Sequence, residues 1–279
     1  MIKLKNFLPI ILTLTAMFTR TEVGAQDSLP RPVTSVYRLE VGAANARSTY
    51  LSPLRYSGSI WSVSGDWSKA FQKNPEHLVM SFSAALNYRS MLNPPGSARM
   101  LGIDARFDWG MAYRWHLPEN LQLTAGALFD LTGGALYLPR NGNNPVTIPA
   151  RVGFDIDASL SWRFKIGKLP MLLTERVSIP FIGAFFSPQY GETFYEIYLG
   201  NHSGLAHCGW WGNNFGINNL LSVKMDFGRT ALEIGYRYDY KSYYANHLFT
   251  ATAANSFVIG VIPQGLGMKN RKKTIYAGY

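Results

Sequence analysis

The feature that most constrains the fold is an alternation of apolar and polar residues that continues over unusually long stretches. From 101 to 115 every odd position is apolar, whereas the even positions include Asp104, Arg106 and Asp108. Successive side chains of a β-strand point to opposite faces, so a strand would place all of this charge on one side. A helix would scatter the same charge around every face. The segment therefore predicts a strand with one apolar and one charged face.

The same alternation recurs along the whole chain. Ten segments show it, clearly at 78–89, 101–115 and 151–165 and more weakly at 36–47, 58–71, 121–132, 172–186, 220–227, 231–241 and 252–262. Several exceed the roughly five or six residues usual in globular sheets. They reach the roughly 9–11 residues that a tilted strand needs to cross a bilayer. The pattern predicts an all-β fold, a transmembrane antiparallel β-barrel of about ten strands. Eight or twelve strands stay open, because the links at 133–150 and 187–219 could each hide a hairpin.

The predicted links alternate in length. Short turns are expected at 72–76, 116–120, 167–170 and 228–230, and longer links at 48–57, 90–100, 133–150, 187–219 and 242–251. Outer-membrane barrels have short periplasmic turns, long outer loops and an aromatic girdle at each interface. Aromatic residues on apolar faces are expected in two bands, Trp67, Phe71, Tyr113, Trp115, Trp162, Phe164 and Phe227 near the short turns, and Tyr88, Phe129, Phe185, Tyr238 and Tyr240 near the long links. A soluble periplasmic β-sandwich with these rings in its core is the alternative.

The chain begins with a predicted secretory signal peptide at 1–25. Lys3 and Lys5 precede an apolar run at 7–18, and Val23-Gly24-Ala25 forms a small-residue cleavage site. The barrel is expected to occupy 26–263, and 264–279 to form a basic C-terminal tail or a short final strand. Because Cys208 is the single cysteine, an internal disulfide is excluded. These features predict a location in the cell outer membrane, with lipid, lipopolysaccharide and the barrel-assembly machinery as partners. Nothing in the pattern points to nucleic acid.

The polar faces of the predicted strands would line the lumen. They contribute a mixed set of acids and bases, Arg38, Glu40, Asp66, Arg89, Asp104, Arg106, Asp108, Arg114, Asp155, Asp157, Arg163, Lys224, Asp226, Glu233, Arg237 and Asp239. A ten-strand barrel is only slightly wider than one of about eight strands, whose interior side chains can fill. Buried charges must pair or be solvated. We therefore expect a lumen plugged by an ion-pair network, with at most a narrow path, rather than a general porin.

The longest link, 187–219, holds the candidates for an active site. His202, Ser203 and Glu196 could form a nucleophile with its base. Outer-membrane phospholipases and lipid A deacylases resemble this loosely, with a histidine and a serine two residues apart. Here the two residues are adjacent and would point to opposite faces of a strand, so the match fails on geometry. The outer-membrane proteases, also ten-stranded, have an acidic pair beside a histidine that this chain does not match. We expect no catalysis, and a lipid-modifying enzyme is the alternative.

The same link is expected to form a lid over the barrel mouth. Its glycines stand beside Trp210 and Trp211, a composition that favours a compact loop. Residues 194–199 read as a strand. His207 and Cys208 are adjacent, but two neighbouring ligands without partners at suitable spacing do not predict a metal site. No metal and no cofactor is expected, and ligand recognition by this loop is plausible because outer loops carry function on a rigid scaffold.

Several loop motifs resemble those of an uncharacterised family of outer-membrane barrel proteins of Bacteroidota. They lie at 50–58 (YLSPLRYSG), 141–145 (NGNNP), 195–197 (YEI) and 211–215 (WGNNF). The resemblance implies the location and the fold, and it transfers no catalytic residue. The sequence therefore predicts a barrel with a non-enzymatic role, namely surface structure, ligand recognition or narrow passage of a small solute.

Overall fold

The computed structural model describes residues 31–142, 144–200 and 203–266 of the 279-residue chain. The predicted signal peptide at 1–25 and the part of the basic tail from 267 onward lie outside these residues, so both stay predictions. Within the described part of the chain, no helix is long and apolar enough to cross a membrane.

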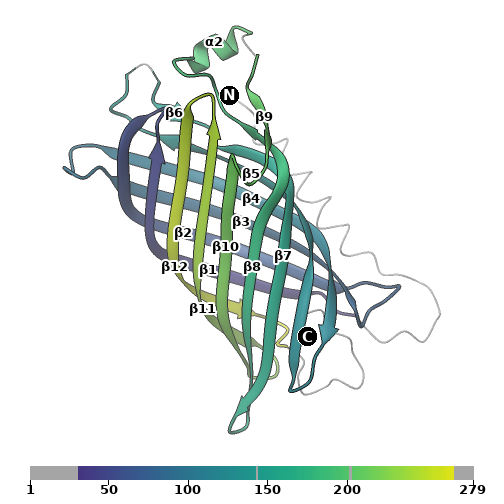
Figure 1. The fold of residues 1–279 in the computed structure, drawn as a ribbon. Helices are drawn as coiled ribbons and strands as arrows, with labels where there is room; N and C mark the ends of the chain where they lie inside the picture. Colours follow the sequence, from purple (N-terminus) through teal and green to yellow (C-terminus); the bar gives the residue numbers. More distant parts are fainter. Residues whose placement is uncertain (1–30, 143, 201–202, 267–279) are drawn as a thin grey trace, which may run out of the picture.

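The described residues form one antiparallel sheet that closes on itself (Figure 1). Ten strands make the wall: β1 (Thr34–Ser48), β2 (Ser52–Ala70), β3 (Leu78–Leu92), β4 (Arg99–His116), β5 (Leu121–Tyr137), β7 (Ala150–Ile166), β8 (Leu169–Phe186), β10 (Asn214–Asp226), β11 (Ala231–Ala245) and β12 (Leu248–Ile262). The ring is completed where β12 pairs with β1 and β8 pairs with β10. The closed ten-strand barrel is confirmed, and a single closed sheet does not support the sandwich alternative.

Two short strands add to the sheet without entering the wall. β6 (Val146–Thr147) pairs only with β5, and β9 (Ala206–Gly209) pairs only with β8. They lie in the two links where an extra hairpin was possible. Neither adds a strand to the ring, so the wall has ten strands rather than twelve.

The alternation places large apolar side chains outside and charges inside. Leu39, Trp61 and Ile103 are each more than half exposed on the outer surface, whereas Arg38 and Glu233 are buried in the interior. A water-soluble protein would lose free energy by exposing so continuous an apolar surface. Lipid accepts it, and a closed sheet leaves no unpaired edge in the hydrocarbon. The fold is of the outer-membrane barrel type.

The apolar band has the height of a membrane. On β4 the outward residues are all apolar from Leu101 to Met111, ten residues further (111 − 101), and the aromatic Tyr113 and Trp115 follow. A rise of about 3.3 Å per residue and a tilt of about 40° give a height of about 25 Å. This is about the height of the apolar band of outer-membrane barrels.

The links differ partly from the prediction. At one end, here the short-turn end, the strands are joined by residues 71–77, 117–120, 167–168 and 227–230; at the other, the long-loop end, by 49–51, 93–98, 138–149, 187–213 and 246–247. The predicted long links at 48–57 and 242–251 are therefore wrong, because both are tight turns. Asn246 and His247 have φ values of 53° and 61°, as in a two-residue hairpin turn. Backbone pairing continues here beyond the point where side-chain alternation stops.

A β-bulge in β8 reverses the side-chain direction near the end of that strand. The pairing of β7 with β8 slips between Phe154 and Asp155, which leaves Phe181 as an extra residue. Phe185 consequently turns into the barrel, where it is 2% exposed and lies against the ring of Tyr243. The prediction that Phe185 belongs to the outer aromatic band was wrong, because one inserted residue moves the following side chains to the other face.

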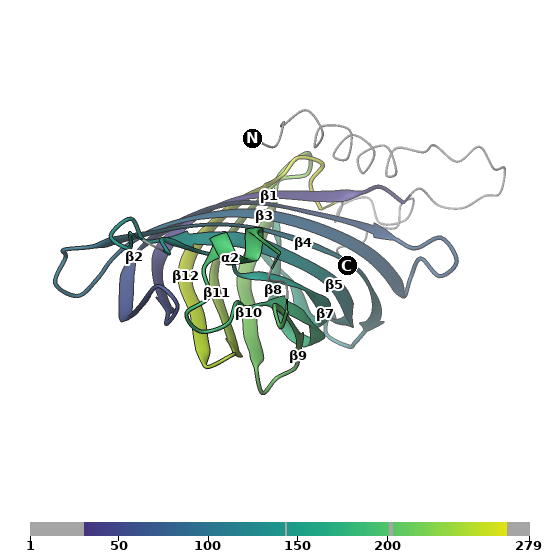
Figure 2. The same cartoon turned by 90° about the horizontal axis from the view of Figure 1, so that it is seen from above.

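The link at 187–213 covers the long-loop end of the barrel (Figure 2). It contains α2 (Phe194–Tyr198), and the strand predicted at 194–199 is therefore wrong. Thr193 and Glu196 form a capping box, in which each side chain accepts a hydrogen bond from the backbone N–H of the other. This Thr-x-x-Glu spacing is a local helix signal that outweighs the β-favouring tyrosines and isoleucine between the caps.

Candidate functional site

Polar and titratable side chains are concentrated in two regions of the barrel. These are the lumen and the link at 187–213, here called the cover. In the lumen, a chain of ion pairs runs from wall to wall. Arg176 of β8 binds Asp157 of β7 at 2.9 Å and Asp66 of β2 at 3.6 Å. Arg38 of β1 then binds both Asp66 and Glu233 of β11, each at 2.5 Å. Because β2 and β8 are five strands apart in a ring of ten, the Arg176–Asp66 contact joins opposite walls. We call these five residues the cross-lumen bridge.

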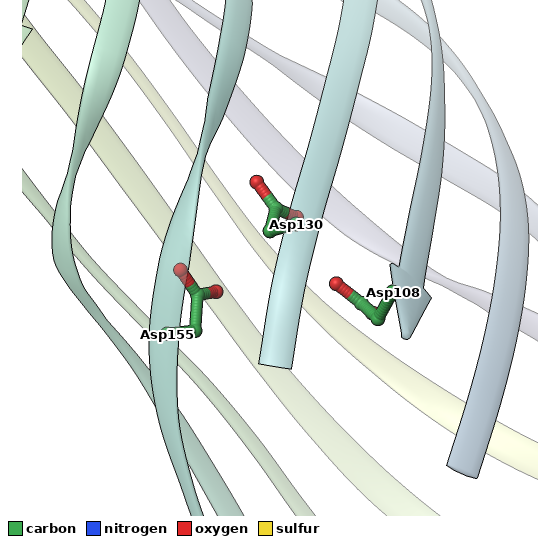
Figure 3. Close-up of side chains that lie close together, drawn as sticks. All are labelled: Asp108, Asp130 and Asp155. Atoms are coloured by element: carbon green, nitrogen blue, oxygen red, sulfur yellow. The ribbon is translucent and has the colours of Figure 1, made fainter. Parts of the chain in front are cut away.

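A second cluster lies nearer the long-loop end (Figure 3). Asp108 of β4, Asp130 of β5 and Asp155 of β7 bring carboxylate oxygens within 4.8 Å of one another. Arg106 contacts all three at 2.9 Å, and Arg151 binds Asp130 and Asp155. Three carboxylates at this spacing could in isolation suit a divalent cation. The two guanidinium groups already neutralise most of their charge, so the geometry is that of an ion-pair cluster.

The other predicted lumen residues also lie on inward faces. Arg89 binds Asp104, and Arg237 binds Glu40 at 3.0 Å. Arg163 follows on the inward face of β7, nearer the short-turn end. Asp130 and Arg176 were absent from the predicted lumen set, although both hold central positions. The sequence signal that could have placed Asp130 in the lumen is the alternation of faces: Asp130 lies between the apolar Phe129 and Leu131, in a strand with no other charge.

Two cavities flank the cross-lumen bridge. The cavity on the long-loop side of the bridge has a volume of about 70 Å³ and is lined by Glu40, Asn87 and Arg237. The cavity on the short-turn side of the bridge has a volume of about 150 Å³ and is lined by Ser81, Gln122 and Thr174. Asp66 and Arg176 line both. Charged side chains line part of each cavity, and each is large enough for several water molecules. Water can therefore solvate the charges on either side of the bridge.

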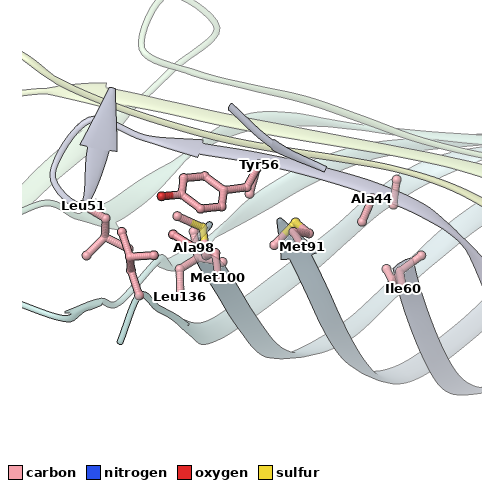
Figure 4. Packing of buried hydrophobic residues seen from close by; sticks show 11 residues of the cluster. Ala44, Leu51, Tyr56, Ile60, Met91, Ala98, Met100 and Leu136 are labelled. Atoms are coloured by element: carbon pink, nitrogen blue, oxygen red, sulfur yellow. The ribbon is translucent and has the colours of Figure 1, made fainter. Parts of the chain in front are cut away.

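Apolar clusters pack inside the barrel toward each end and line parts of these cavities. At the long-loop end the cluster contains Ala44, Ala46, Leu51, Tyr56, Ile60, Met91, Ala98, Met100, Leu136, Leu138 and Ala254 (Figure 4). At the short-turn end it contains Val36, Leu172, Ala231, Ile262 and Leu266. Leu266 belongs to the segment after β12, which Gln264 ties to the carbonyl oxygens of Val33 and Ser35. The described part of the lumen thus has a charged middle with two cavities and an apolar cluster toward each end.

The cover over the long-loop end is held by several contacts. Tyr50 donates a hydrogen bond of 2.7 Å to the carbonyl of Glu192, and its ring packs on Phe194. Asn246 donates to the carbonyl of Pro188 at 3.2 Å and lies 3.2 Å from the His207 ring nitrogen. These contacts tie the link to the β1–β2 turn and to the β11–β12 turn. The cover is therefore anchored to the barrel by side-chain contacts.

The cover carries six large exposed apolar side chains, five of them aromatic. Tyr190, Tyr195, Tyr198, Leu199, Trp210 and Trp211 are between 52% and 83% exposed. Residues 187–213 contain no lysine or arginine. We call these six residues the aromatic platform. Exposed rings on a rigid support often mark a recognition surface.

The predicted catalytic candidates are not assembled into a site by the described residues. Ser203 lies in a turn, and His202 lies outside the described residues. Glu196 is engaged in the capping box, where hydrogen bonds from the Thr193 backbone and hydroxyl lower the pKa of its carboxyl. His207 lies 3.3 Å from the carbonyl oxygen of Ser187, and Cys208 is exposed on β9. Glu196 and His207 thus have structural contacts that account for their positions.

These features define an antiparallel barrel of the outer-membrane type, with a charged interior and a structured cover. The chain belongs to the family described as protein of unknown function (DUF3316), whose model matches residues 7–272. This agrees with the predicted membership of an uncharacterised barrel family. A search of curated protein sequences finds no match.

The chain is similar to several solved structures at low identity. The transport unit of the autotransporter AIDA-I from Escherichia coli has a TM-score of 0.46 and 6% identity, over 91% of this chain and 96% of that one. The translocator domain of the autotransporter NalP from Neisseria meningitidis has a TM-score of 0.40 and 12% identity, over 92% and 94%. Neisserial surface protein A has a TM-score of 0.33 and 11% identity, over 83% and 99%. At these identities the likeness concerns the fold alone.

Proposed function

We propose that the protein spans the outer membrane of a Gram-negative bacterium as a non-conducting barrel and recognises a ligand through its aromatic platform. The observation that carries this proposal is the platform itself, a set of exposed rings on an anchored cover. Assignment to Bacteroidota stays a prediction from the loop motifs. Insertion by the barrel-assembly machinery is part of the same proposal.

The membrane placement is supported by the outward apolar band. Its height of about 25 Å fits the hydrocarbon region that outer-membrane barrels occupy. Heat-modifiable migration on a denaturing gel tests this placement, because a folded membrane barrel resists unfolding in the sample buffer at room temperature. We expect the unheated protein to migrate faster than the boiled protein. Identical migration, together with extraction from cells without detergent, would overturn it.

A non-conducting lumen is supported by the cross-lumen bridge. The bridge ties opposite walls, and apolar clusters pack at both ends of the described lumen. Moving an ion past such groups would require breaking buried ion pairs, which is costly. In a planar lipid bilayer we expect no conductance steps. Regular steps at the level of a narrow channel would favour solute passage instead.

The chemistry of the platform favours an uncharged oligosaccharide as ligand. Tyrosine and tryptophan combine a flat apolar face with a polar edge, so they can stack on sugar rings and hydrogen-bond to hydroxyls. Without lysine or arginine between 187 and 213, the surface offers no strong partner for phosphate or sulfate. A neutral sugar chain fits both properties.

Titration of tryptophan fluorescence tests this recognition. The protein in neutral detergent micelles is mixed with neutral bacterial surface oligosaccharides and, separately, with their phosphorylated counterparts. We expect saturable changes with the neutral set that are lost in a Tyr195→Ala/Tyr198→Ala variant. A matched control, Tyr137→Ala, removes an exposed tyrosine from β5 outside the platform. No saturable binding, or equal loss in the control, would overturn platform recognition.

A lipid-modifying enzyme is the competing function. Assays on phospholipid and lipid A in micelles distinguish the two. We expect no turnover. Turnover that is lost in His202→Ala or Ser203→Ala would replace recognition by hydrolysis at the 187–213 cover.

A further inference from the structure

Four exposed arginines lie at the long-loop end, on the side of the barrel formed by β1 to β5. Arg47 is on β1, Arg55 on β2, Arg99 on β4, and Arg140 on the link after β5. Arg47 and Arg99 each stand between two buried residues, and Arg55 directly precedes the buried Tyr56, so their side chains leave the barrel wall on the outside. We call these four residues the arginine cluster.

The strand register brings the cluster together. Pairing of Ala46 with Tyr56 places Arg47 and Arg55 side by side on β1 and β2. Across β3, Leu92 pairs directly with Arg99 of β4. Arg140 reaches back to Ser97, in the turn before β4, with a hydrogen bond of 3.2 Å. The four residues therefore lie along one stretch of the rim, from β1 to the link after β5.

The cluster has no acidic counterpart among the described residues. None of its members makes an ion pair with a carboxylate there, whereas Arg38, Arg106 and Arg176 in the lumen each bind at least two. Arg47 instead lies 6.0 Å from the centre of the Phe249 ring, which supports the guanidinium without neutralising it. Repeated positive charge on one rim favours an anion supplied from outside the chain.

The height of the cluster indicates which anion that is. On β4 Arg99 stands two residues before Leu101, where the outward apolar face of that strand begins. On β1 and β2 the outward polar residues Asn45, Ser57 and Ser59 separate Arg47 and Arg55 from the apolar band, so the cluster lies just above it. Lipid headgroups lie at this level, and outward apolar side chains such as Trp61 and Ile103 continue below it. A free anion would use only the arginines. A lipid would use the arginines with its headgroup and the apolar wall with its acyl chains.

We propose that the arginine cluster binds the phosphate groups of a phosphorylated glycolipid of the lipid A class in the outer leaflet. A guanidinium group donates two parallel hydrogen bonds to phosphate and keeps its charge at any physiological pH. The proposal rests on the membrane placement proposed above and is independent of the ligand of the aromatic platform. It assigns the β1–β5 side of the rim to lipid and leaves the cover free for recognition.

Native mass spectrometry from neutral detergent tests the proposal, with EDTA present so that divalent cations cannot bridge. The probes are diphosphorylated lipid A and the same lipid A without phosphates. We expect the intact protein to retain the diphosphorylated form. A variant with Arg47→Gln, Arg55→Gln, Arg99→Gln and Arg140→Gln should bind it at least about tenfold more weakly, since each basic residue near an anionic surface contributes appreciably.

A matched control removes the same kind of charge from the other end of the barrel. Lys73→Gln, Lys168→Gln and Arg229→Gln alter exposed residues of three short turns, and this variant should bind as the unmodified protein does. Equal retention of both lipids, unchanged binding by the fourfold variant, or equal loss in the control would overturn the proposal. If the fourfold variant does not show heat-modifiable folding, Arg47→Gln/Arg55→Gln serves in its place. Failure of the unmodified protein itself to show heat-modifiable migration would instead refute the membrane placement.

Discussion

Trp211 donates its indole N–H to the carbonyl oxygen of Pro180, and this bond lies where the wall of the barrel is interrupted. The ladder between β8 and β10 ends at the pair Ser178–Asn218, and β8 continues with β9 from the pair Gly183–Gly209. Residues 179–182 of β8 and 214–217 of β10 thus face each other but do not pair with each other. Proline has no N–H for a ladder bond at this position, and its carbonyl oxygen accepts the Trp211 N–H from the cover.

Replacing this side chain should loosen the wall locally. In Trp211→Phe the N–H donor is lost, while an aromatic ring remains beside Phe181. The ring centres of Phe181 and Trp211 are 6.0 Å apart. We expect amide exchange at 179–182 and 214–217 to rise about threefold to tenfold, the effect of one hydrogen bond. Rates at 171–177 should not change. Hydrogen exchange with mass spectrometry measures this, Trp210→Phe is the control, and unchanged rates at the gap would contradict the role of Trp211.

Glu233 should be one of the most sensitive positions for stability. Its side chain is fully buried and lies 2.5 Å from Arg38 and 3.8 Å from Lys224. In Glu233→Gln two buried cations lose a counter-charge, which typically costs about 3–5 kcal/mol. Urea unfolding in micelles measures the change, and Glu76→Gln at an exposed turn position provides the control. A decrease in the free energy of unfolding of less than about 1 kcal/mol would mean that water in the neighbouring cavity, and not Glu233, stabilises these two cations.

The wall of this barrel was predictable because side-chain parity repeats along every strand. All ten predicted strands coincide with wall strands, and what failed was information that parity does not contain. The turn at Asn246 depends on backbone conformation, and the helix start at Thr193 on a local capping box. Ion pairs such as Arg176–Asp66 depend on which strands lie opposite one another, which follows only from the closed ring. Parity could have assigned Asp130 to the lumen, but it could not supply its partners.

The β8 bulge gives a test of that parity argument. Deleting Phe181 removes only the residue without a partner on β7, so the neighbouring residues keep their pairs and Phe185 stays inside. We expect this variant to fold, with heat-modifiable migration. Deleting Val177, which lies within the regular ladder, forces one side of the strand onto the wrong face and should abolish folding. Similar behaviour of the two deletions would contradict the assignment of Phe181 as the inserted residue.

The capping box should make the order of α2 depend on pH. Hydrogen bonds from the backbone N–H and hydroxyl of Thr193 lower the pKa of Glu196 in the folded cover. A carboxyl whose folded pKa is below its unfolded value stabilises the fold above the unfolded pKa and loses this contribution as the pH falls through the folded pKa. Carbon chemical shifts of residues 194–198, recorded by NMR in micelles from pH 7 to pH 3, should therefore lose helical character toward the acid end.

Two variants serve as controls for this pH response. In Glu196→Gln the side-chain amide accepts the same bonds without titrating, so the shifts of residues 194–198 should stay constant, and any residual change reports other acids. Thr193→Ala should weaken the helix at every pH. Identical titration curves for the unmodified protein and Glu196→Gln would show that the pH response comes from elsewhere in the barrel.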